Sequence, residues 1–176
     1  MHCDVSIGNM MLYEDEHDGF LIDLDVAALI QRHQASGAPT KTGTKVFMSI
    51  GVLLGYHHSF MDDLESVFWA LFWFCAHCTG PGQEKSTVHE LEQWNYDGTT
   101  DLAYKKAGLV SLEGELERAL YKFVSDYYKS FIPWLIKLSK VVFPDGKQWR
   151  QEDKGLYTRM KGILQEALED VNVIWE

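Results

Sequence analysis

Apolar residues are most concentrated between Val67 and Ala76, where no position carries a charge. Ser59, followed three positions later by Asp62, is typical of a helix start, and Gly80-Pro81-Gly82 ends the pattern. A helix is therefore expected from about Met61 to Cys78. Because its second half is apolar on every face, we expect it to be buried on all sides and to form the centre of the fold.

Two β-favouring runs, Asn9–Tyr13 and Phe20–Ile22, lie nearer the N-terminus and are separated by the polar stretch Glu14–Gly19. The Asp18-Gly19 dipeptide favours a tight turn, because glycine adopts positive φ without a steric penalty. The pattern predicts a short β-hairpin over residues 9–24.

Beyond residue 82 the apolar positions recur every three to four residues, which is typical of amphipathic helices. The predicted helices are Thr87–Trp94, Thr100–Lys106, Leu112–Phe131, which Pro133 would break or kink, and a last one with apolar positions from Leu156 to Val171. Pro144-Asp-Gly146 predicts a turn. The expected fold is mainly α and forms one domain over residues 1–176, with the hairpin preceding a helical bundle around the buried helix.

The composition, 46% hydrophobic and 24% charged over 176 residues, is that of a folded globular chain. The formal net charge of −10 argues against a nucleic-acid partner and against an anionic membrane surface, both of which need clustered Lys and Arg. Three cysteines are too few for a disulfide framework, and Cys75 and Cys78 are interpreted as buried structural residues. We expect an intracellular protein, cytoplasmic or nuclear.

Candidate chemistry is concentrated in the first 50 residues. His2, Asp4 and Asn9 have the spacing H-x-D-x-x-x-x-N of a protein kinase catalytic loop, and Asp23 follows the second strand of the predicted hairpin. Phosphoryl transfer needs a positioned hydroxyl and neutralised phosphate charge. Asp4 suits the first task, and Asn9 and Asp23 offer the hard oxygen ligands that Mg²⁺ prefers.

Five ordered blocks together resemble the fungal-type protein kinase family, a divergent branch of the protein kinase-like fold. The blocks are His2-Cys-Asp-Val-Ser-Ile-Gly-Asn9, Phe20-Leu-Ile-Asp-Leu-Asp25, Thr42-Gly-Thr-Lys-Val-Phe-Met-Ser49, His58-Ser-Phe-Met-Asp-Asp-Leu-Glu-Ser66 and Leu91-Glu-Gln-Trp-Asn95. The resemblance implies a kinase-like C-lobe, with the catalytic loop, metal-binding hairpin and activation segment in residues 1–50 and a helical core in residues 59–176.

The resemblance also implies an activity and a set of site residues. The activity is ATP-dependent phosphorylation of serine or threonine in a protein substrate, with Mg²⁺ held by Asn9 and Asp23. The catalytic residues would be Asp4, Asn9, Asp23 and Thr44, with Thr44 hydrogen-bonded to Asp4. Asp63 would accept hydrogen bonds from the catalytic-loop backbone, which His2 also supports.

Two alternative functions stay open at this point. No glycine-rich loop and no N-lobe lysine strand occurs within residues 1–176, so the chain resembles only the C-lobe portion, and we expect it to be inactive alone. A truncated or pseudokinase-like chain that acts by binding is therefore one alternative. The other is a small-molecule phosphotransferase of the same superfamily, favoured by Cys3 in place of the usual arginine and by Asp25, but disfavoured by Gly43-Thr44. The substrate, oligomeric state and pathway are left open.

Overall fold

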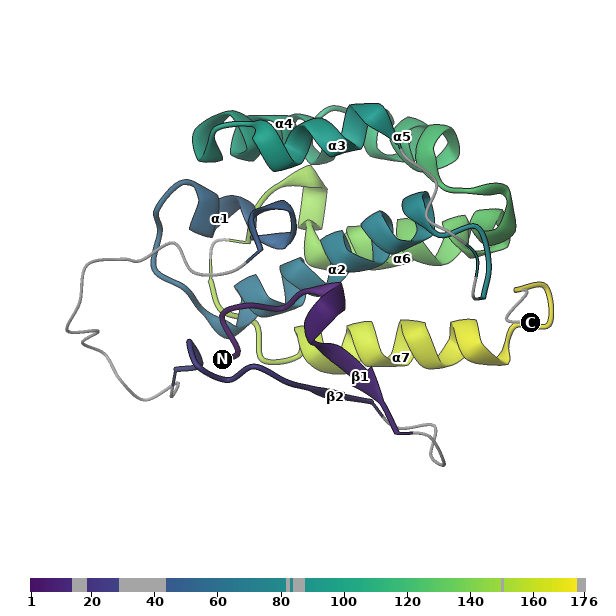
Figure 1. Cartoon of the computed structure of the whole chain (residues 1–176), viewed down its shortest axis with the longest axis horizontal. Coiled ribbons are helices and arrows are strands. Elements are labelled where there is room, and N and C mark those ends of the chain that lie inside the picture. The colour runs from purple at the N-terminus through teal and green to yellow at the C-terminus, as the bar shows by residue number, and fades with distance from the viewer. Residues whose placement is uncertain (14–18, 29–43, 82, 84–87, 150, 174–176) are drawn as a thin grey trace.

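The computed structural model describes residues 1–13, 19–28, 44–81, 83, 88–149 and 151–173 (Figure 1). This part of the chain is mainly helical and contains one two-stranded sheet, as the sequence predicted. The strands and α-helices are β1 (Met10–Leu12), β2 (Gly19–Leu21), α1 (Ile50–Leu53), α2 (Phe60–His77), α3 (His89–Tyr96), α4 (Thr99–Ser111), α5 (Glu115–Phe123), α6 (Ile132–Val142) and α7 (Leu156–Glu169). Short 3-10 turns are η1 (Ile7–Asn9), η2 (Lys45–Phe47), η3 (Asp126–Phe131) and η4 (Pro144–Gly146).

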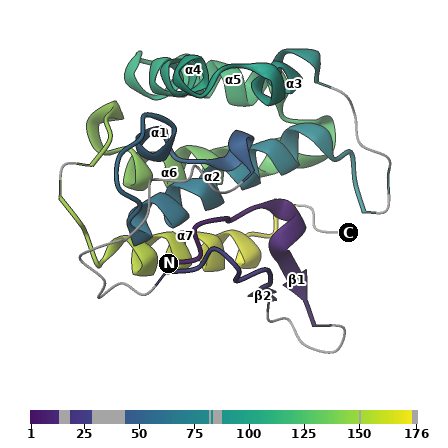
Figure 2. The same cartoon turned by 60° about the vertical axis from the view of Figure 1, so that its left-hand side comes forward.

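The elements are stacked in three layers (Figures 1 and 2). Helices α3, α4 and α5 form one outer layer, and α1, α2 and α6 form the middle one. The hairpin and α7 lie on the other side of the middle layer. Helix α2 packs against α6 and α7 and against η2, so it occupies the centre that the sequence predicted for it.

The start of α2 is fixed by a capping box. The Ser59 hydroxyl accepts a hydrogen bond from Met61 N, and the Asp62 carboxylate accepts one from Ser59 N at 2.8 Å. Two otherwise unpaired backbone donors are thereby satisfied, and two acidic residues lie where the positive end of the helix dipole favours them. The cap sets the position of the neighbouring Asp63.

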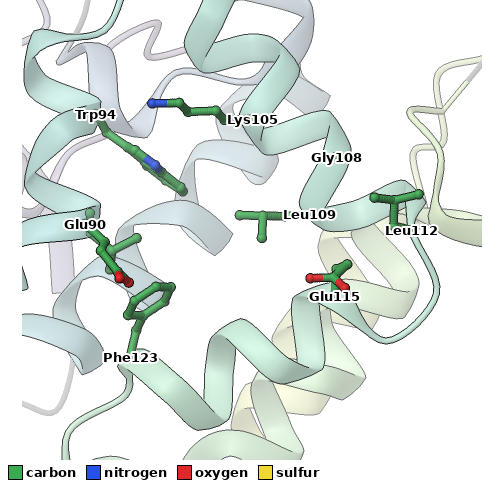
Figure 3. A pocket seen from close by; sticks show the side chains of 9 residues that line it. Glu90, Trp94, Lys105, Gly108, Leu109, Leu112, Glu115 and Phe123 are labelled. Carbon is green, nitrogen blue, oxygen red and sulfur yellow. The ribbon is translucent and has the colours of Figure 1, made fainter.

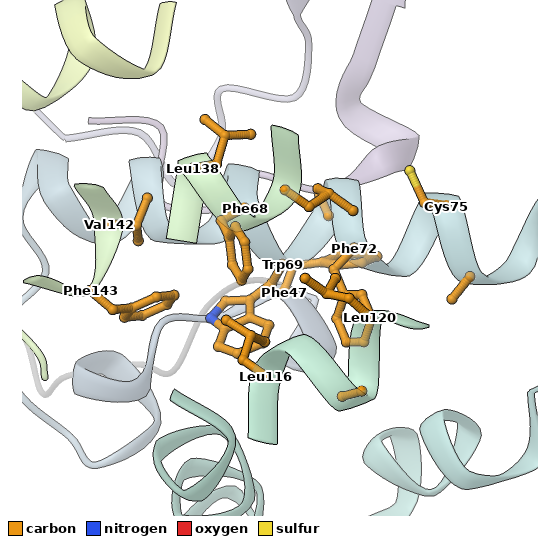
Figure 4. Close-up of a cluster of buried hydrophobic side chains, with 14 of the residues drawn as sticks. Phe47, Phe68, Trp69, Phe72, Cys75, Leu116, Leu120, Leu138, Val142 and Phe143 are labelled. Atoms are coloured by element: carbon orange, nitrogen blue, oxygen red, sulfur yellow. The ribbon is translucent and has the colours of Figure 1, made fainter. Parts of the chain in front are cut away.

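The core is built on the aromatic side chains of α2 (Figure 4). Phe68 and Trp69 are fully buried and pack against Phe143, with ring centroids 5.4 Å and 5.6 Å from it. Trp69 also meets Trp94 of α3 edge to face at 5.7 Å. These contacts join α2 to segments that follow it at widely separated places in the chain, so a single apolar helix organises the whole domain.

The expectation that α2 is buried on all sides is wrong for one of its faces. Val67, Leu71 and Phe74, spaced at three and four residues, are only half-buried. They line an apolar groove of about 580 Å³ between α2 and the hairpin. The hairpin covers this face incompletely, because its two strands are only three residues long each.

The hairpin is formed where the sequence predicts it. Met10 is opposite Leu21 and Leu12 is opposite Gly19 in an antiparallel pair. The Ile22 N–H donates to the Asn9 carbonyl at 2.9 Å, which extends the pairing by one position. Asp18 of the predicted turn lies outside the described residues.

The helix predicted from Leu112 to Phe131 is wrong in its extent. The chain forms α5 and then the 3-10 helix η3, with extended backbone at Val124 and Ser125 between them. The Ser125 N–H donates to the carbonyl of Cys75 at 2.9 Å, so a tertiary contact with the end of α2 replaces a helical hydrogen bond. Periodicity alone did not reveal this break, because the apolar spacing continues across it.

Three further boundaries differ from the prediction. Pro133 lies in the first turn of α6, where a missing N–H costs nothing, so it begins a helix instead of breaking one. Helix α4 continues to Ser111, five residues beyond the predicted end. Val171 lies beyond α7 and is 95% exposed, so it is not part of the apolar face. The short helix α1 was not predicted. The helix predicted from Thr87 is observed as α3, and Thr87 itself lies outside the described residues.

Candidate functional site

The site predicted from the sequence lies where the N-terminal segment crosses the start of α2 (Figure 1). His2 is buried and holds three segments together. Its backbone N–H donates to Asp63 Oδ2 at 2.6 Å, its Nδ1 accepts the Asp4 N–H at 3.3 Å, and its Nε2 lies 2.8 Å from the Ile22 carbonyl. Since Nδ1 accepts, Nε2 carries the proton and donates to Ile22.

Asp63 is the anchor of the loop that contains Asp4. Its two oxygens accept the N–H groups of His2 and Cys3, the latter at 3.0 Å, and Oδ1 also contacts His58 Nε2 at 2.8 Å. Burial alone would raise the pKa of Asp63, but the hydrogen bond and charge of His58 and the two backbone donors outweigh it and hold the pKa below its ordinary value. The carboxylate therefore stays ionised, and the backbone contact that the sequence predicted for Asp63 is present.

Asp4 is half-buried and is contacted from a distant part of the chain. Its Oδ1 accepts a hydrogen bond from the backbone N–H of Thr44 at 2.8 Å. The sequence predicted a hydrogen bond between these two residues, and in the structure the backbone of Thr44 makes it. Among the described residues nothing donates to Asp4 Oδ2, which leaves this oxygen available to a ligand hydroxyl.

Asn9 and Asp23 lie at the open end of the hairpin. Asn9 Nδ2 donates to the Asp4 carbonyl at 2.9 Å, and the Asn9 carbonyl accepts from Ile22, the residue before Asp23. The Asn9 Oδ1 and both Asp23 carboxylate oxygens accept no hydrogen bond within the part of the chain that the structure describes. The two residues predicted to bind Mg²⁺ thus lie on neighbouring backbone positions, and their oxygens are of the hard type that this ion takes in proteins.

Two non-glycine residues of this segment adopt the left-handed backbone region. Cys3 has φ 66° and Asp23 has φ 62°. Such conformations cost about 1–3 kcal/mol each and persist only where the surroundings enforce them. At Cys3 the enforcing contact is the hydrogen bond to Asp63, and at Asp23 it is the pair of hydrogen bonds made by the preceding Ile22.

The segment that follows Thr44 is fixed by a buried lysine of α4. Lys106 Nζ donates to the carbonyls of Val46 at 2.8 Å and Met48 at 2.7 Å, and it lies 4.6 Å from the centre of the Trp69 ring. The two carbonyl acceptors and the face of the Trp69 ring stabilise the ammonium cation in this buried position. The backbone donor that contacts Asp4 is therefore connected to the core through η2.

Glu65 of α2 interacts electrostatically with this lysine. It is fully buried, and its Oε1 accepts from Ile50 N at 2.8 Å and from Trp69 Nε1 at 3.0 Å. Burial raises the pKa of Glu65 and lowers the pKa of Lys106, and each residue partly offsets the shift of the other. The pair is thus a polar network inside the core that anchors the start of α1 and η2.

Three site residues were not found by sequence reasoning. Glu65 was noted only as part of the block that ends at Ser66, and Lys106 only as the end of a predicted helix, so neither was given a role in the site. His58 was noted as the first residue of a family block, and its contact with Asp63 was not foreseen. Thr42 and Gly43 of the predicted activation segment lie outside the described residues.

A second concave surface lies away from these residues, in the layer of α3, α4 and α5 (Figures 1 and 3). Its volume is about 330 Å³, and Trp94, Leu109 and Phe123 form its apolar floor. The acidic residues at its rim are paired, Glu90 with Lys122 at 2.7 Å and Glu115 with Arg118 at 2.8 Å. It contains none of the sequence-predicted site residues.

Comparison with known proteins identifies one family. Residues 1–75 match the family model described as fungal protein kinase, which bears out the resemblance drawn from the sequence blocks. The match includes every predicted site residue and ends within α2. No curated protein and no solved structure matches the chain. No described helix has the length and apolar character needed to span a membrane.

Proposed function

We propose that this chain, when complete with an N-lobe, transfers the γ-phosphate of ATP to a serine or threonine hydroxyl of a protein substrate, since residues 1–75 match the fungal protein kinase family model. The observation that supports this most is the meeting of three chain segments at one place. Asp4 accepts from Thr44, and it is joined to Asn9 and, through Ile22, to Asp23. The carboxylate and the two metal-ligand candidates thus lie on backbone that is tied together by hydrogen bonds.

In this proposal Asp4 positions the acceptor hydroxyl through its free Oδ2 and accepts its proton. The hydroxyl oxygen forms a bond to the γ-phosphorus, the bond from that phosphorus to the bridging oxygen breaks, and ADP leaves with the electron pair. The Thr44 N–H holds Oδ1, which fixes the orientation of the carboxylate. Asp4 thereby acts as a rigidly oriented base.

Asn9 and Asp23 would hold Mg²⁺, which neutralises phosphate charge when bound. The hydrogen bond from Asn9 Nδ2 to the Asp4 carbonyl turns the amide so that Oδ1 remains for the ion. The left-handed backbone of Asp23 sets the direction of its side chain relative to the end of β2. Both ligands are therefore oriented by contacts outside the metal itself.

The test uses the full-length protein with radiolabelled ATP, Mg²⁺ and a histone as acceptor. Asp4→Asn and Asp23→Asn should each reduce phosphate incorporation at least about a hundredfold, since each removes a charge that acts on the reacting groups. Asp25→Asn is the matched control: it removes an exposed carboxylate two residues from Asp23 and should preserve incorporation.

Other outcomes separate the alternatives. Incorporation that survives Asp23→Asn overturns the proposed metal site. A phosphorylated metabolite as the only product replaces the protein-kinase proposal with a small-molecule phosphotransferase. Protein that is folded by circular dichroism but shows neither ATP binding nor incorporation supports a role by binding alone.

A further inference from the structure

Cys3, which lies between His2 and Asp4, comes together with His58 and Asp63 at the start of α2. One ligand atom from each residue lies within 4.8 Å of those of the other two. The three side chains are all half-buried, and they come from two segments more than fifty residues apart. No residue proposed to hold Mg²⁺ belongs to this cluster.

We propose that Cys3, His58 and Asp63 bind a zinc ion, with a fourth position open to water. This inference concerns a second metal site and does not rest on the proposed kinase activity.

The donor set selects zinc over magnesium. A thiolate, an imidazole nitrogen and a carboxylate oxygen are the three ligand types that Zn²⁺ takes in proteins, whereas Mg²⁺ takes oxygen ligands and seldom sulfur. Two anionic ligands and one neutral imidazole balance the double charge of the ion. The complex would therefore be electrically neutral, which suits a half-buried position.

The geometry requires little rearrangement. Tetrahedral zinc with bonds of about 2.0–2.3 Å places its donor atoms about 3.3–3.8 Å apart, so shifts of roughly an ångström suffice. His58 Nε2 and Asp63 Oδ1 are already 2.8 Å apart. The ion would enter by replacing their direct contact, while the backbone bonds from His2 and Cys3 continue to hold the carboxylate.

The backbone that presents the ligands is fixed without the ion. His58 directly precedes the Ser59 cap, and Asp63 lies in the first turn of the same helix. Cys3 is held in its left-handed conformation against Asp63 by its own N–H, at 3.0 Å. Zinc would thus join the catalytic loop to the start of α2 by coordinate bonds in addition to the hydrogen bonds.

Cobalt titration of the full chain tests the site. Co²⁺ should bind once per chain, with the near-ultraviolet charge-transfer absorption of a cobalt–thiolate bond, and zinc should displace it. Cys3→Ser should abolish that absorption, and His58→Ala should weaken cobalt binding at least about tenfold. The matched controls are His57→Ala, which alters the exposed neighbouring histidine, and Cys78→Ala, which breaks the Cys-x-x-Cys pair; both should bind as the wild type does.

A second measurement avoids substitutions that disturb the fold. In the wild-type chain zinc should protect Cys3 from alkylation, as read by mass spectrometry, and should raise the melting temperature relative to chelator-treated protein. Absence of thiolate absorption in the wild type, its persistence in Cys3→Ser, its loss in Cys78→Ala, or unchanged alkylation of Cys3 would each overturn the proposal.

Discussion

Asp4 Oδ1 accepts a hydrogen bond from the backbone N–H of Thr44 at 2.8 Å, although the two residues are 40 positions apart. The contact connects Asp4 to the helical core through η2 and Lys106. Lys106 holds the carbonyl groups of Val46 and Met48, so the turn that begins after Thr44 is attached to α4. The orientation of the Asp4 carboxylate consequently depends on residues of the helical core.

Replacing Thr44 tests whether its backbone or its side chain matters. Thr44 has φ −69°, a value that proline adopts without strain, so Thr44→Pro is compatible with this φ and replaces the N–H donor by a Cδ that excludes Asp4 Oδ1 from its position. We expect at least a tenfold loss of phosphate incorporation by the full-length protein. Thr44→Ala keeps the N–H and should stay within about threefold of wild type.

Thermal denaturation is the control for both Thr44 variants, and each should melt close to the wild type, because Thr44 is exposed. Equal losses of incorporation in the two variants would mean that the hydroxyl carries the effect, and the assignment to the backbone would then be wrong.

Asp63 is expected to contribute more to stability than any surface carboxylate. Asp63→Ala leaves the N–H groups of His2 and Cys3 and the His58 ring without their acceptor, at about 1–3 kcal/mol for each unsatisfied buried donor. Because all three donors are only partly buried, the expected loss in free energy of unfolding is smaller than this sum, about 2–4 kcal/mol, measured by urea denaturation. Asp63→Asn, which retains one acceptor oxygen, should fall between Ala and wild type.

The pH dependence provides a second readout for Asp63. Because its pKa is depressed in the folded protein, its contribution is complete above the ordinary value of 3.8 and is lost as pH falls through the lower folded pKa. Asp25→Asn is the control, since that carboxylate is exposed and accepts no hydrogen bond from the described residues. A wild-type denaturation midpoint for Asp63→Ala would contradict the anchoring role.

The Glu65–Lys106 pair should produce a stability minimum near neutral pH. Burial raises the pKa of Glu65 to about 7, so between 4.5 and 7 the folded state holds a proton that the unfolded state has released. Stability from this residue therefore falls as pH rises through that window. Burial lowers the pKa of Lys106 to about 7, and between 7 and 10.5 the unfolded state holds the extra proton, so stability rises again.

The measurement compares urea denaturation of the wild type with that of the Glu65→Gln/Lys106→Met double variant from pH 5 to 9. The double variant lacks both titrating groups, so the difference between the two curves isolates the pair, with slopes of at most about 1.4 kcal/mol per pH unit. A difference that does not change with pH would show that the pair titrates outside this window. Lys106→Met alone should destabilise more than the double variant, because it leaves Glu65 buried without its cation.

The sequence predicted those features that depend on local signals. The Ser59–Asp62 cap, the hairpin and the catalytic-loop spacing of His2, Asp4 and Asn9 are all encoded within a few residues of one another. The break at Ser125 was missed because its cause is a hydrogen bond to the distant Cys75 carbonyl. Long-range polar contacts of this kind leave no periodic trace in the sequence.

The same distinction applies to the site. Family motifs in the sequence predicted hydrogen bonds from the segment His2–Asp4 to Asp63 and between Asp4 and Thr44. The structure contains these hydrogen bonds. Lys106 escaped notice because its acceptors are backbone carbonyls, which any residue supplies, at a separation of about 60 positions. Its role could be seen only once the fold had brought α4 beside η2.

Two glycines with positive φ provide a matched test of the packing of η4. Gly146 has φ +66°, and a Cβ there would lie 2.6 Å from the Val110 carbonyl oxygen at the end of α4. Gly55 has φ +88° but no described atom within 4 Å of such a Cβ. Gly55→Ala should therefore show only the backbone penalty of about 1–2 kcal/mol.

Gly146→Ala adds a clash with backbone that cannot rotate away, so we expect a loss of more than about 3 kcal/mol in urea denaturation. The difference between the two variants measures how tightly η4 is packed against α4, because both share the left-handed backbone. Equal losses would mean that η4 moves away from Val110 at little cost. In that case the contact between α4 and η4 would not help to hold Lys106, and the position of α4 would depend on its packing against α1 and α5.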